Sequence, residues 1–197
     1  MQWWTKNEEF LGAINVESIN KSIGFNSYSV SRADLQKILL ERISELDISI
    51  FYKFSAKDIS YQDNANSVSF ENDTSVNAKI IIGADGRMNS IAYKYVTGNN
   101  MPVYQNFVNW VGMIENEQSI FSENKVLDFW GNGERFGIVP INENKGYWAG
   151  GKSFPLNSSL KMGNSKKALK RLFGSWSSKI NEVIELTKNE NIKYRGL

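Results

Sequence analysis

A glycine-rich turn after a short apolar run is the segment of this sequence with the clearest potential for chemistry. The three isoleucines at 80–82 favour a fully buried strand, and Gly83-Ala84-Asp85-Gly86 then predicts a tight turn. Helical signals resume at residues 90–96 and stop at Gly98. In a strand–turn–helix of this kind, small residues allow close backbone approach, and free N–H groups with the helix dipole favour an anion. The pattern predicts a phosphate-binding turn, although an ordinary strand-to-helix connection has the same spacing.

The residue types that the chain lacks also restrict its chemistry. The 197 residues include no cysteine and no histidine. Disulfides, thiolate nucleophiles, the Ser-His-Asp triad and most zinc sites are therefore excluded. If the protein is an enzyme, its own carboxylates, lysines or tyrosines do the work, or a bound cofactor does it.

A second glycine pattern is not a nucleotide site. Gly131, Gly133 and Gly137 have the wrong spacing for a dinucleotide fingerprint. They also lie in an expected hairpin, without the strand-then-helix context that such a fingerprint needs.

The composition is that of a globular protein without a strong charge bias. Hydrophobic residues make up 41% of the chain and aromatic residues 13%. The 23 basic and 21 acidic residues give a net charge of +2, which argues against a nucleic-acid or membrane-surface partner. No apolar run approaches the ~18 residues that span a bilayer, so a cytoplasmic protein is the default expectation.

The first half of the chain predicts one helix and a three-stranded meander. Residues 1–28 are expected to be irregular, whereas residues 31–46 have the i, i+3, i+4 spacing of an amphipathic helix. The expected strands are residues 48–54, 67–70 and 76–82.

The second half predicts an antiparallel sheet followed by helices. The expected strands are residues 103–114, 125–130, 135–141 and 146–151, with turns at Gly131-Asn132-Gly133 and Asn142-Glu143-Asn144. The helical pattern begins at Ser165 and breaks at Gly174.

Several of these segments, taken in order, resemble a known family. They are Ser31-Arg32-Ala33-Asp34-Leu35, the meander, Ile81-Ile82-Gly83-Ala84-Asp85-Gly86, the run from Gly131 to Pro140, Gly146-Tyr147-Trp148 and Leu172-Phe173-Gly174-Ser175-Trp176. This order resembles the FAD-dependent aromatic-ring monooxygenases of the p-hydroxybenzoate hydroxylase type. Within that family it is most similar to the salicylate hydroxylase, urate hydroxylase and zeaxanthin epoxidase branch.

The resemblance implies a mixed α/β (α+β) fold with three parts. Residues 1–98 would be an incomplete, Rossmann-like FAD-binding domain, and residues 99–164 the antiparallel sheet of the substrate domain. Residues 165–197 would be helices that lead back toward the FAD domain.

The resemblance also implies cofactor-binding residues. Arg32 matches the family arginine that contacts the flavin cofactor, and Asp85 with Gly86 matches the motif near the FAD pyrophosphate, which is also linked to NAD(P)H use. The match then departs from the family pattern, because Asn89 and Ala92 stand where a serine and an arginine are usual. Ser90 is a possible substitute for the serine, so the departure affects NAD(P)H use more than the fold.

Two residues of the expected sheet are candidates for substrate binding. Arg135, Gly137 and Val139 share one face of a strand by their two-residue spacing, and Tyr147 on the next strand is expected near that face. Under the resemblance, Arg135 and Tyr147 would orient a polar aromatic substrate. The alternative is that Arg135 faces solvent and Tyr147 packs in the sheet.

Two hallmarks of the family are absent, namely a GxGxxG after a first strand and the later Gly-Asp segment. The expectation is therefore an internal fragment of a monooxygenase about twice as long, with apolar faces at residues 76–82 and 31–46 left partly uncovered. Such faces predict self-association.

Two functional interpretations follow. In the first, the chain derives from an enzyme that uses FAD, NAD(P)H and O2 to oxygenate a small aromatic or olefinic substrate, but has little activity alone. In this interpretation the flavin makes the bonds, and no side chain is nominated as catalytic. In the second, the chain is a non-catalytic remnant or ligand-binding module, or one half of a split flavoprotein.

Overall fold

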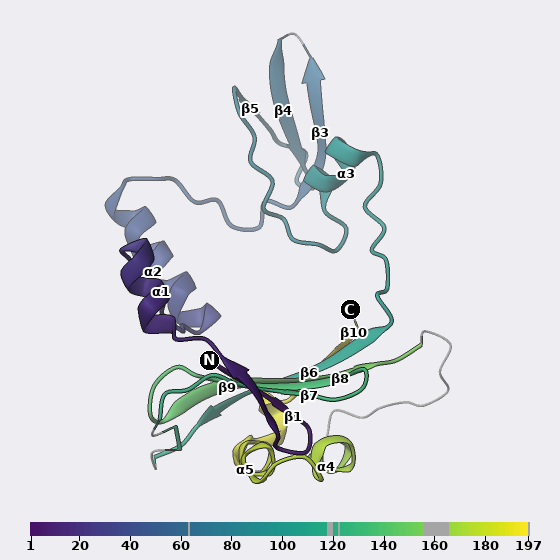
Figure 1. Ribbon diagram of the computed structural model, residues 1–197. Coiled ribbons are helices and arrows are strands. Elements are labelled where there is room, and N and C mark those ends of the chain that lie inside the picture. Colours follow the sequence, from purple (N-terminus) through teal and green to yellow (C-terminus); the bar gives the residue numbers. More distant parts are fainter. Residues whose placement is uncertain (63, 118–119, 122, 156–165, 197) are drawn as a thin grey trace. The chain divides into compact units, whose positions relative to one another are not determined.

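The protein, described by a computed structural model, consists of two compact units (Figure 1). The structure describes residues 1–62, 64–117, 120–121, 123–155 and 166–196. The large unit comprises Met1–Lys37 and Tyr104–Leu197, and the small unit comprises Ile38–Val103. Among the described residues, no helix has both the length and the apolar character needed to cross a bilayer.

The large unit is built on a mixed sheet, whose described strands lie in the order β10-β6-β9-β8-β7-β1-β2. These strands are β1 (Gln2–Thr5), β2 (Phe10–Ala13), β6 (Phe107–Glu115), β7 (Leu127–Trp130), β8 (Glu134–Pro140), β9 (Lys145–Ser153) and β10 (Lys193–Gly196). Neighbouring strands are antiparallel except β1 and β7, which are parallel. The unit also contains α1 (Val16–Ile23), α4 (Lys166–Phe173), α5 (Ser178–Leu186) and the short η1 (Asn189–Asn191).

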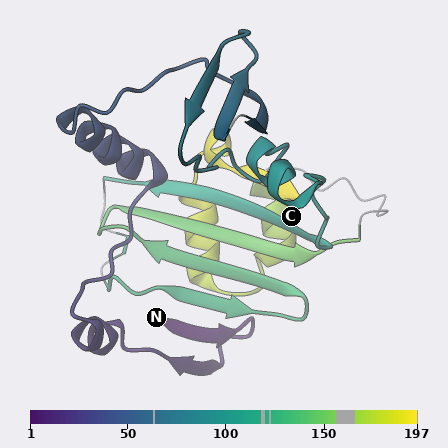
Figure 2. The same ribbon diagram turned by 90° about the horizontal axis from the view of Figure 1, so that it is seen from above.

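One face of this sheet packs on α4 and α5, which Figures 1 and 2 show on the same side of the strands. Buried residues alternate with less buried ones along β6, β8 and β9, as expected for a sheet covered on one face. The core between the layers is aromatic: the Phe136 ring stacks on Trp148 at 5.3 Å and meets Phe173 edge-on at 5.2 Å. The Trp148 indole donates to Thr187 Oγ1 at 2.7 Å, so its buried N–H is satisfied. The opposite face of the sheet, called the open face below, carries the less buried residues.

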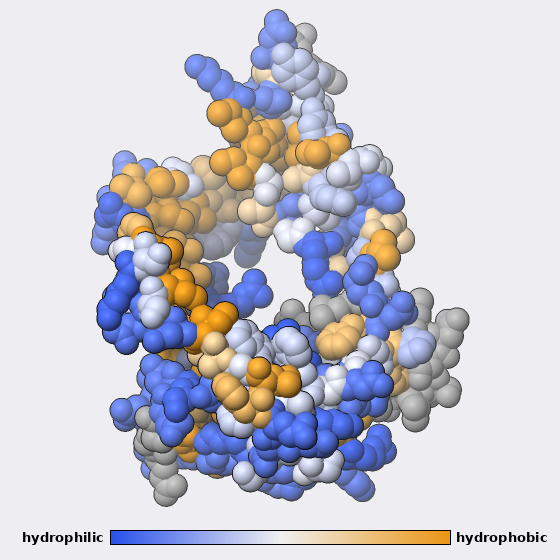
Figure 3. Space-filling model, in the orientation of Figure 1, coloured by the Kyte–Doolittle hydropathy of each residue, from blue (hydrophilic) through white to orange (hydrophobic). Residues whose placement is uncertain are grey.

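The small unit has a three-stranded antiparallel sheet and one helix. The strands are β3 (Ala56–Gln62), β4 (Ala65–Phe70) and β5 (Ser75–Ala78), and the helix is α3 (Ile91–Thr97). The helix α2 (Arg32–Glu45) begins in the large unit and ends in the small one. In the small unit no described hydrophobic residue is fully buried, and Figure 3 shows hydrophobic side chains, in orange, on its surface.

The structure confirms the mixed α/β fold and most of the expected elements. The helix expected at 31–46 is α2, and the four strands expected after residue 100 are β6–β9. Gly133, at φ 69°, lies in the β7–β8 turn, and Gly98, at φ 77°, ends α3. The break at Gly174 separates α4 from α5. The helix start predicted at Ser165 lies outside the described residues.

Three expectations were wrong. Residues 48–54 form no strand, and the strand expected at 76–82 ends at Ala78, so residues 80–82 are not buried. Ile80 is 77% exposed and Ile82 86% exposed, because no described element covers them. Residues 1–28 are not irregular, because β1 inserts between β7 and β2. The strand β10, which pairs with β6, was not expected.

The compact units divide the chain differently from the expected domains. The first 37 residues belong with the large sheet through the pairing of β1 with β7, whereas the expected first domain ran to residue 98. The expected boundary at 164/165 lies outside the described residues. The assignment of these segments to a FAD domain and a substrate domain stays a prediction.

Candidate functional site

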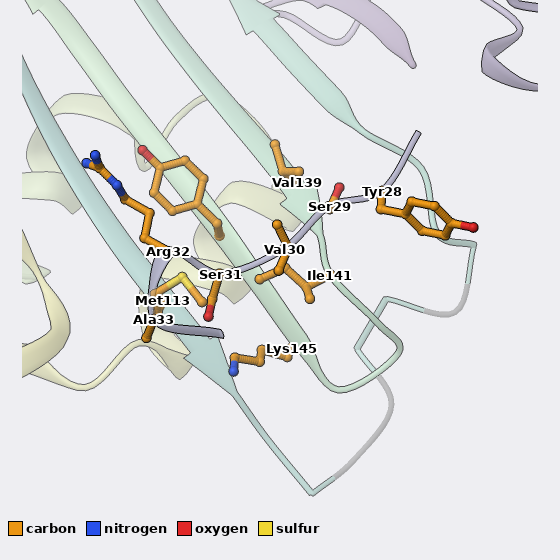
Figure 4. Close-up of a pocket in the computed structure, with 11 residues that line it drawn as sticks. Tyr28, Ser29, Val30, Ser31, Arg32, Ala33, Met113, Val139, Ile141 and Lys145 are labelled. Carbon is orange, nitrogen blue, oxygen red and sulfur yellow. The ribbon is translucent and has the colours of Figure 1, made fainter. Parts of the chain in front are cut away.

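A cavity of about 760 Å³ lies in the large unit, between the open face of the sheet and the segment that leads into α2 (Figure 4). Pockets of this size hold cofactors and drug-sized ligands in other proteins. Its lining is formed by Tyr28, Ser29, Val30, Ser31, Arg32, Ala33, Met113, Val139, Ile141, Lys145 and Tyr147. The lining combines an apolar centre with hydroxyl groups and two cations.

The sheet side of the cavity follows from strand register. Tyr147 on β9 pairs with Met113 on β6 and with Val139 on β8, so these three side chains form one row across the open face. Lys145 precedes Tyr147 by two residues on the same face. An aromatic ring, a thioether and aliphatic groups therefore form a largely apolar wall, with an ammonium group at one end.

The opposite wall is fixed by the start of α2. The Asp34 backbone N–H donates to Ser31 Oγ at 3.1 Å, and Ser31 Oγ donates to Asp34 Oδ2 at 2.5 Å, a cap that begins the helix at this point. Lys145 Nζ donates to the same Asp34 oxygen at 3.4 Å and so joins β9 to α2. The hydrogen bonds from Ser31 and Lys145 lower the pKa of Asp34.

Arg32 is the first residue of α2 and lines the cavity, as does Tyr147. Figure 4 shows the Arg32 side chain extending away from Lys145. Among the described residues, no hydrogen bond or ion pair involves its guanidinium, which leaves its donors available to a ligand.

Asp85 and Gly86 lie in the small unit, where the Asp85 side chain binds the first N–H groups of α3. Its carboxylate accepts hydrogen bonds from Ser90 Oγ at 2.6 Å and from the backbone N–H of Ile91 at 2.6 Å and of Ala92 at 3.3 Å. The Ser90 hydrogen bond is the main cause of a lowered Asp85 pKa. The free N–H groups expected to attract a phosphate are thus occupied here by a carboxylate. Ser90 is the N-cap residue of α3, and its hydroxyl group also donates to Asp85.

The glycine turn has a steric requirement at Gly83. A side chain added there would overlap with the Ala92 methyl group, so turn and helix approach each other more closely than larger residues allow. Gly86 has φ 86°, and an added Cβ there would have no neighbour within 4 Å. Glycine is therefore favoured at this position by the backbone conformation and not by a lack of room for a side chain.

The structure does not bring Arg135 and Tyr147 together. They lie on the same face, but the β8–β9 register places Arg135 opposite Gly151 and Tyr147 opposite Val139. Four residues of strand, roughly 13 Å, separate the two positions. The cavity lining includes Tyr147 but not Arg135, whose guanidinium pairs with Asp128 on β7. That hydrogen-bonded pair raises the Arg135 pKa.

Asp34 was part of the motif that opens the helix but was not predicted as a site residue, and Lys145 and Asp128 were not singled out from the sequence. The Ser31-x-x-Asp34 spacing is a capping signal that places Asp34 at the helix start. Lys145 and Asp128 gave weaker signals, because each matters only through a partner that is distant in sequence or lies on a neighbouring strand, Asp34 for Lys145 and Arg135 for Asp128.

No family model matches the chain. Among curated proteins, it is 27% identical over 168 residues to a FAD-dependent urate hydroxylase from Mycolicibacterium vanbaalenii, covering 84% of this chain and 42% of that protein. It is 22% identical to an aurachin C monooxygenase/isomerase from Stigmatella aurantiaca, covering 93% of this chain and 47% of that protein. The chain spans a little under half the length of these relatives.

Solved structures show the same fold. Klebsiella pneumoniae HpxO complexed with FAD and uric acid aligns with a TM-score of 0.82 at 19% identity, over 100% of this chain and 50% of HpxO. CtdE in complex with FAD and a substrate aligns with a TM-score of 0.75 at 12% identity, over 100% of this chain and 51% of CtdE. These findings confirm the resemblance to FAD-dependent monooxygenases that the motifs predicted.

Proposed function

We propose that this chain forms the substrate-facing sheet and part of the flavin-binding surface of a FAD-dependent monooxygenase of the hydroxylase or epoxidase type. It is similar to a FAD-dependent urate hydroxylase, and its fold matches half of a protein that has been solved with FAD and uric acid. The observation that carries the proposal is the cavity, where the Tyr147 ring and the Arg32 guanidinium, which has no partner among the described residues, line one space.

The residues present suit part of FAD. Arg32 offers several N–H donors to ribityl or phosphate oxygens, and the apolar wall of Met113, Val139 and Tyr147 suits the flat substrate ring on which the flavin would act. When bound, the flavin would supply the redox chemistry with NAD(P)H and O2, while the apolar wall keeps water from the reacting region. The chain has no GxGxxG segment, so the pyrophosphate needs further contacts from elsewhere.

Asp85 and Gly86 remain proposed cofactor-binding residues, and their geometry indicates how they would act. Asp85 fixes the start of α3 by accepting two backbone N–H groups, and so shapes the turn that Gly86 completes. In this proposal the turn approaches the cofactor through its backbone rather than through the carboxylate.

For the substrate we propose a small aromatic or olefinic molecule held on the open face. Tyr147 would contact its ring in the cavity, and Arg135 would contact a polar group farther along the sheet. The uric acid bound by HpxO is a small aromatic molecule and supports this class.

FAD titration tests the proposal through flavin fluorescence and retention in gel filtration. We expect Arg32→Ala to weaken FAD binding about tenfold, since hydrogen bonds from a charged donor are lost. Arg42→Ala is the matched control, because Arg42 lies on the same helix and pairs with Glu45 at 2.5 Å. Equal FAD affinity in all three proteins, or no FAD binding by the unaltered chain, would argue against a cofactor site at Arg32.

A second candidate is supported by the exposed isoleucines at 80 and 82. Their exposure favours one half of a split flavoprotein, or a binding module that self-associates, in which another surface covers this segment. The two candidates differ in whether FAD is retained by the isolated chain.

A further inference from the structure

Asp128 is a buried carboxylate on the open face of the sheet. It lies on β7, and its side chain is only 2% exposed. A carboxylate in such a place is unfavourable unless it is paired and hydrogen-bonded, so its partners account for its presence.

Those partners come from both strands of the β7–β8 hairpin, next to its turn. Arg135 donates through Nε at 2.7 Å to one carboxylate oxygen and through Nη2 at 2.8 Å to the other. Trp130 Nε1 donates to the second oxygen at 2.8 Å. The two parallel N–H bonds fix both the position and the plane of the guanidinium.

Arg135 retains donors after forming this pair. A guanidinium has five N–H groups, and Asp128 accepts from two of them. The Arg135 side chain is 59% exposed, so the other N–H groups face the space above the sheet. An ordinary surface arginine is mobile and well hydrated, whereas this one is held rigidly by a buried partner.

We propose that Asp128 is a positioning residue, which holds Arg135 as a preorganised receptor for a planar oxyanion, such as a carboxylate or an aromatic enolate, on the ligand. This inference rests on the proposed function, since it concerns the same open face. The nearby pair of Lys152 and Glu134 makes one 2.7 Å contact through a flexible ammonium and has no such fork. It therefore serves as an internal comparison.

The test uses urate and benzoate as anionic aromatic probes, with binding followed by tryptophan fluorescence. We expect Asp128→Asn and Arg135→Met each to weaken binding about tenfold, and the double variant to be no weaker than Arg135→Met alone. Glu134→Gln, which removes only the comparison pair, is expected to leave the affinity within twofold of the unaltered chain. Additive effects in the double variant, or no effect of Asp128→Asn, would overturn the proposal.

A second variant keeps the test valid if Asp128→Asn does not fold. Arg135→Lys retains the positive charge at an exposed position but loses the fork, so we expect it to bind as weakly as Arg135→Met. Full binding by Arg135→Lys would overturn the proposal. If the unaltered chain binds FAD but neither probe, the proposal fails while the proposed function stands; if it binds neither FAD nor a probe, both fail.

Discussion

The two units of this protein use apolar residues in opposite ways. In the large unit, Trp110, Phe136, Trp148 and Phe173 are completely buried between the sheet and two helices. In the small unit, the only described residue that is buried is Ser90, and Ile80, Ile82 and Val96 are all at least 77% exposed. β-branched and aromatic residues occur in both units, so composition does not explain the difference.

The difference lies in whether a second layer is present. A sheet becomes stable when another element covers its apolar face. α4 and α5 do this for the large sheet, whereas the described part of the small unit offers no comparable layer for residues 80–82. The same sequence signal, a run of β-branched residues, thus predicts burial only where a covering element exists.

The largest expected effect is on folding stability. Phe136→Ala removes a ring that contacts Trp148 and Phe173, and is expected to lower the free energy of unfolding by about 3–5 kcal/mol. Ile82→Ala, the corresponding change in the small unit, is expected to change it by less than about 0.5 kcal/mol. Urea unfolding followed by far-ultraviolet circular dichroism, which reports the secondary structure of both units, measures both. Comparable losses would show that the small unit has a core of its own.

The next effect concerns association. The double substitution Ile80→Lys and Ile82→Lys is expected to convert any self-associated species to monomer, because it places charge on the exposed apolar segment. Light scattering after gel filtration measures the mass. Asn77→Lys is the control, since it adds a lysine at an exposed position of β5 without removing an apolar side chain. A monomeric unaltered chain would contradict the proposed self-association.

A smaller effect is expected within the small unit. Ser90 Oγ accepts from the Tyr93 N–H at 2.9 Å, and Ser90→Ala is expected to destabilise α3 by about 1 kcal/mol. Hydrogen exchange of the α3 amides should accelerate while that of β6 and β9 is unchanged. Ser44→Ala, at an exposed position in α2, should leave the exchange of α3 as it was. Accelerated exchange throughout the large sheet would mean that the units are not energetically separate.

The smallest effect is a pH dependence that arises from one carboxylate at the start of α3 and one at the start of α2. Asp85 and Asp34 have folded-state pKa values below the ordinary 3.8, so each stabilises the folded form above pH 3.8. This stabilisation is lost as the pH falls through the lower folded-state value. We expect α3 and the start of α2 to loosen in acid, as measured by amide exchange. Asp85→Asn should remove the dependence in α3 alone, and Asp34→Asn in α2 alone; a variant that changed both would contradict this independence.

Sequence patterns predicted the second half of the fold well, because β-branched and aromatic runs and the turn residues between them specify β6–β9 locally. They failed at residues 1–28, whose structure depends on β7, far along the chain. For the site, Arg32 and Tyr147 were chosen from motifs, and both line the cavity. The importance of Asp128 depends on its pairing with Arg135, and that of Lys145 on its pairing with Asp34. Such pairs depend on register and helix placement, which local patterns do not contain.

The parallel pairing of β1 with β7 has a consequence for the order of folding. Gln2 aligns with Leu127, so the N-terminal strand cannot join the sheet until the ribosome has released the β7 segment. The hairpins β7–β8 and β8–β9 need only nearby residues and are expected to form early. Until then, β1, β2 and α1 have exposed apolar side chains and no sheet to join. A chaperone that binds nascent apolar segments would therefore be expected to bind the first 25 or so residues and to release them once β7 has been synthesised and can pair with β1.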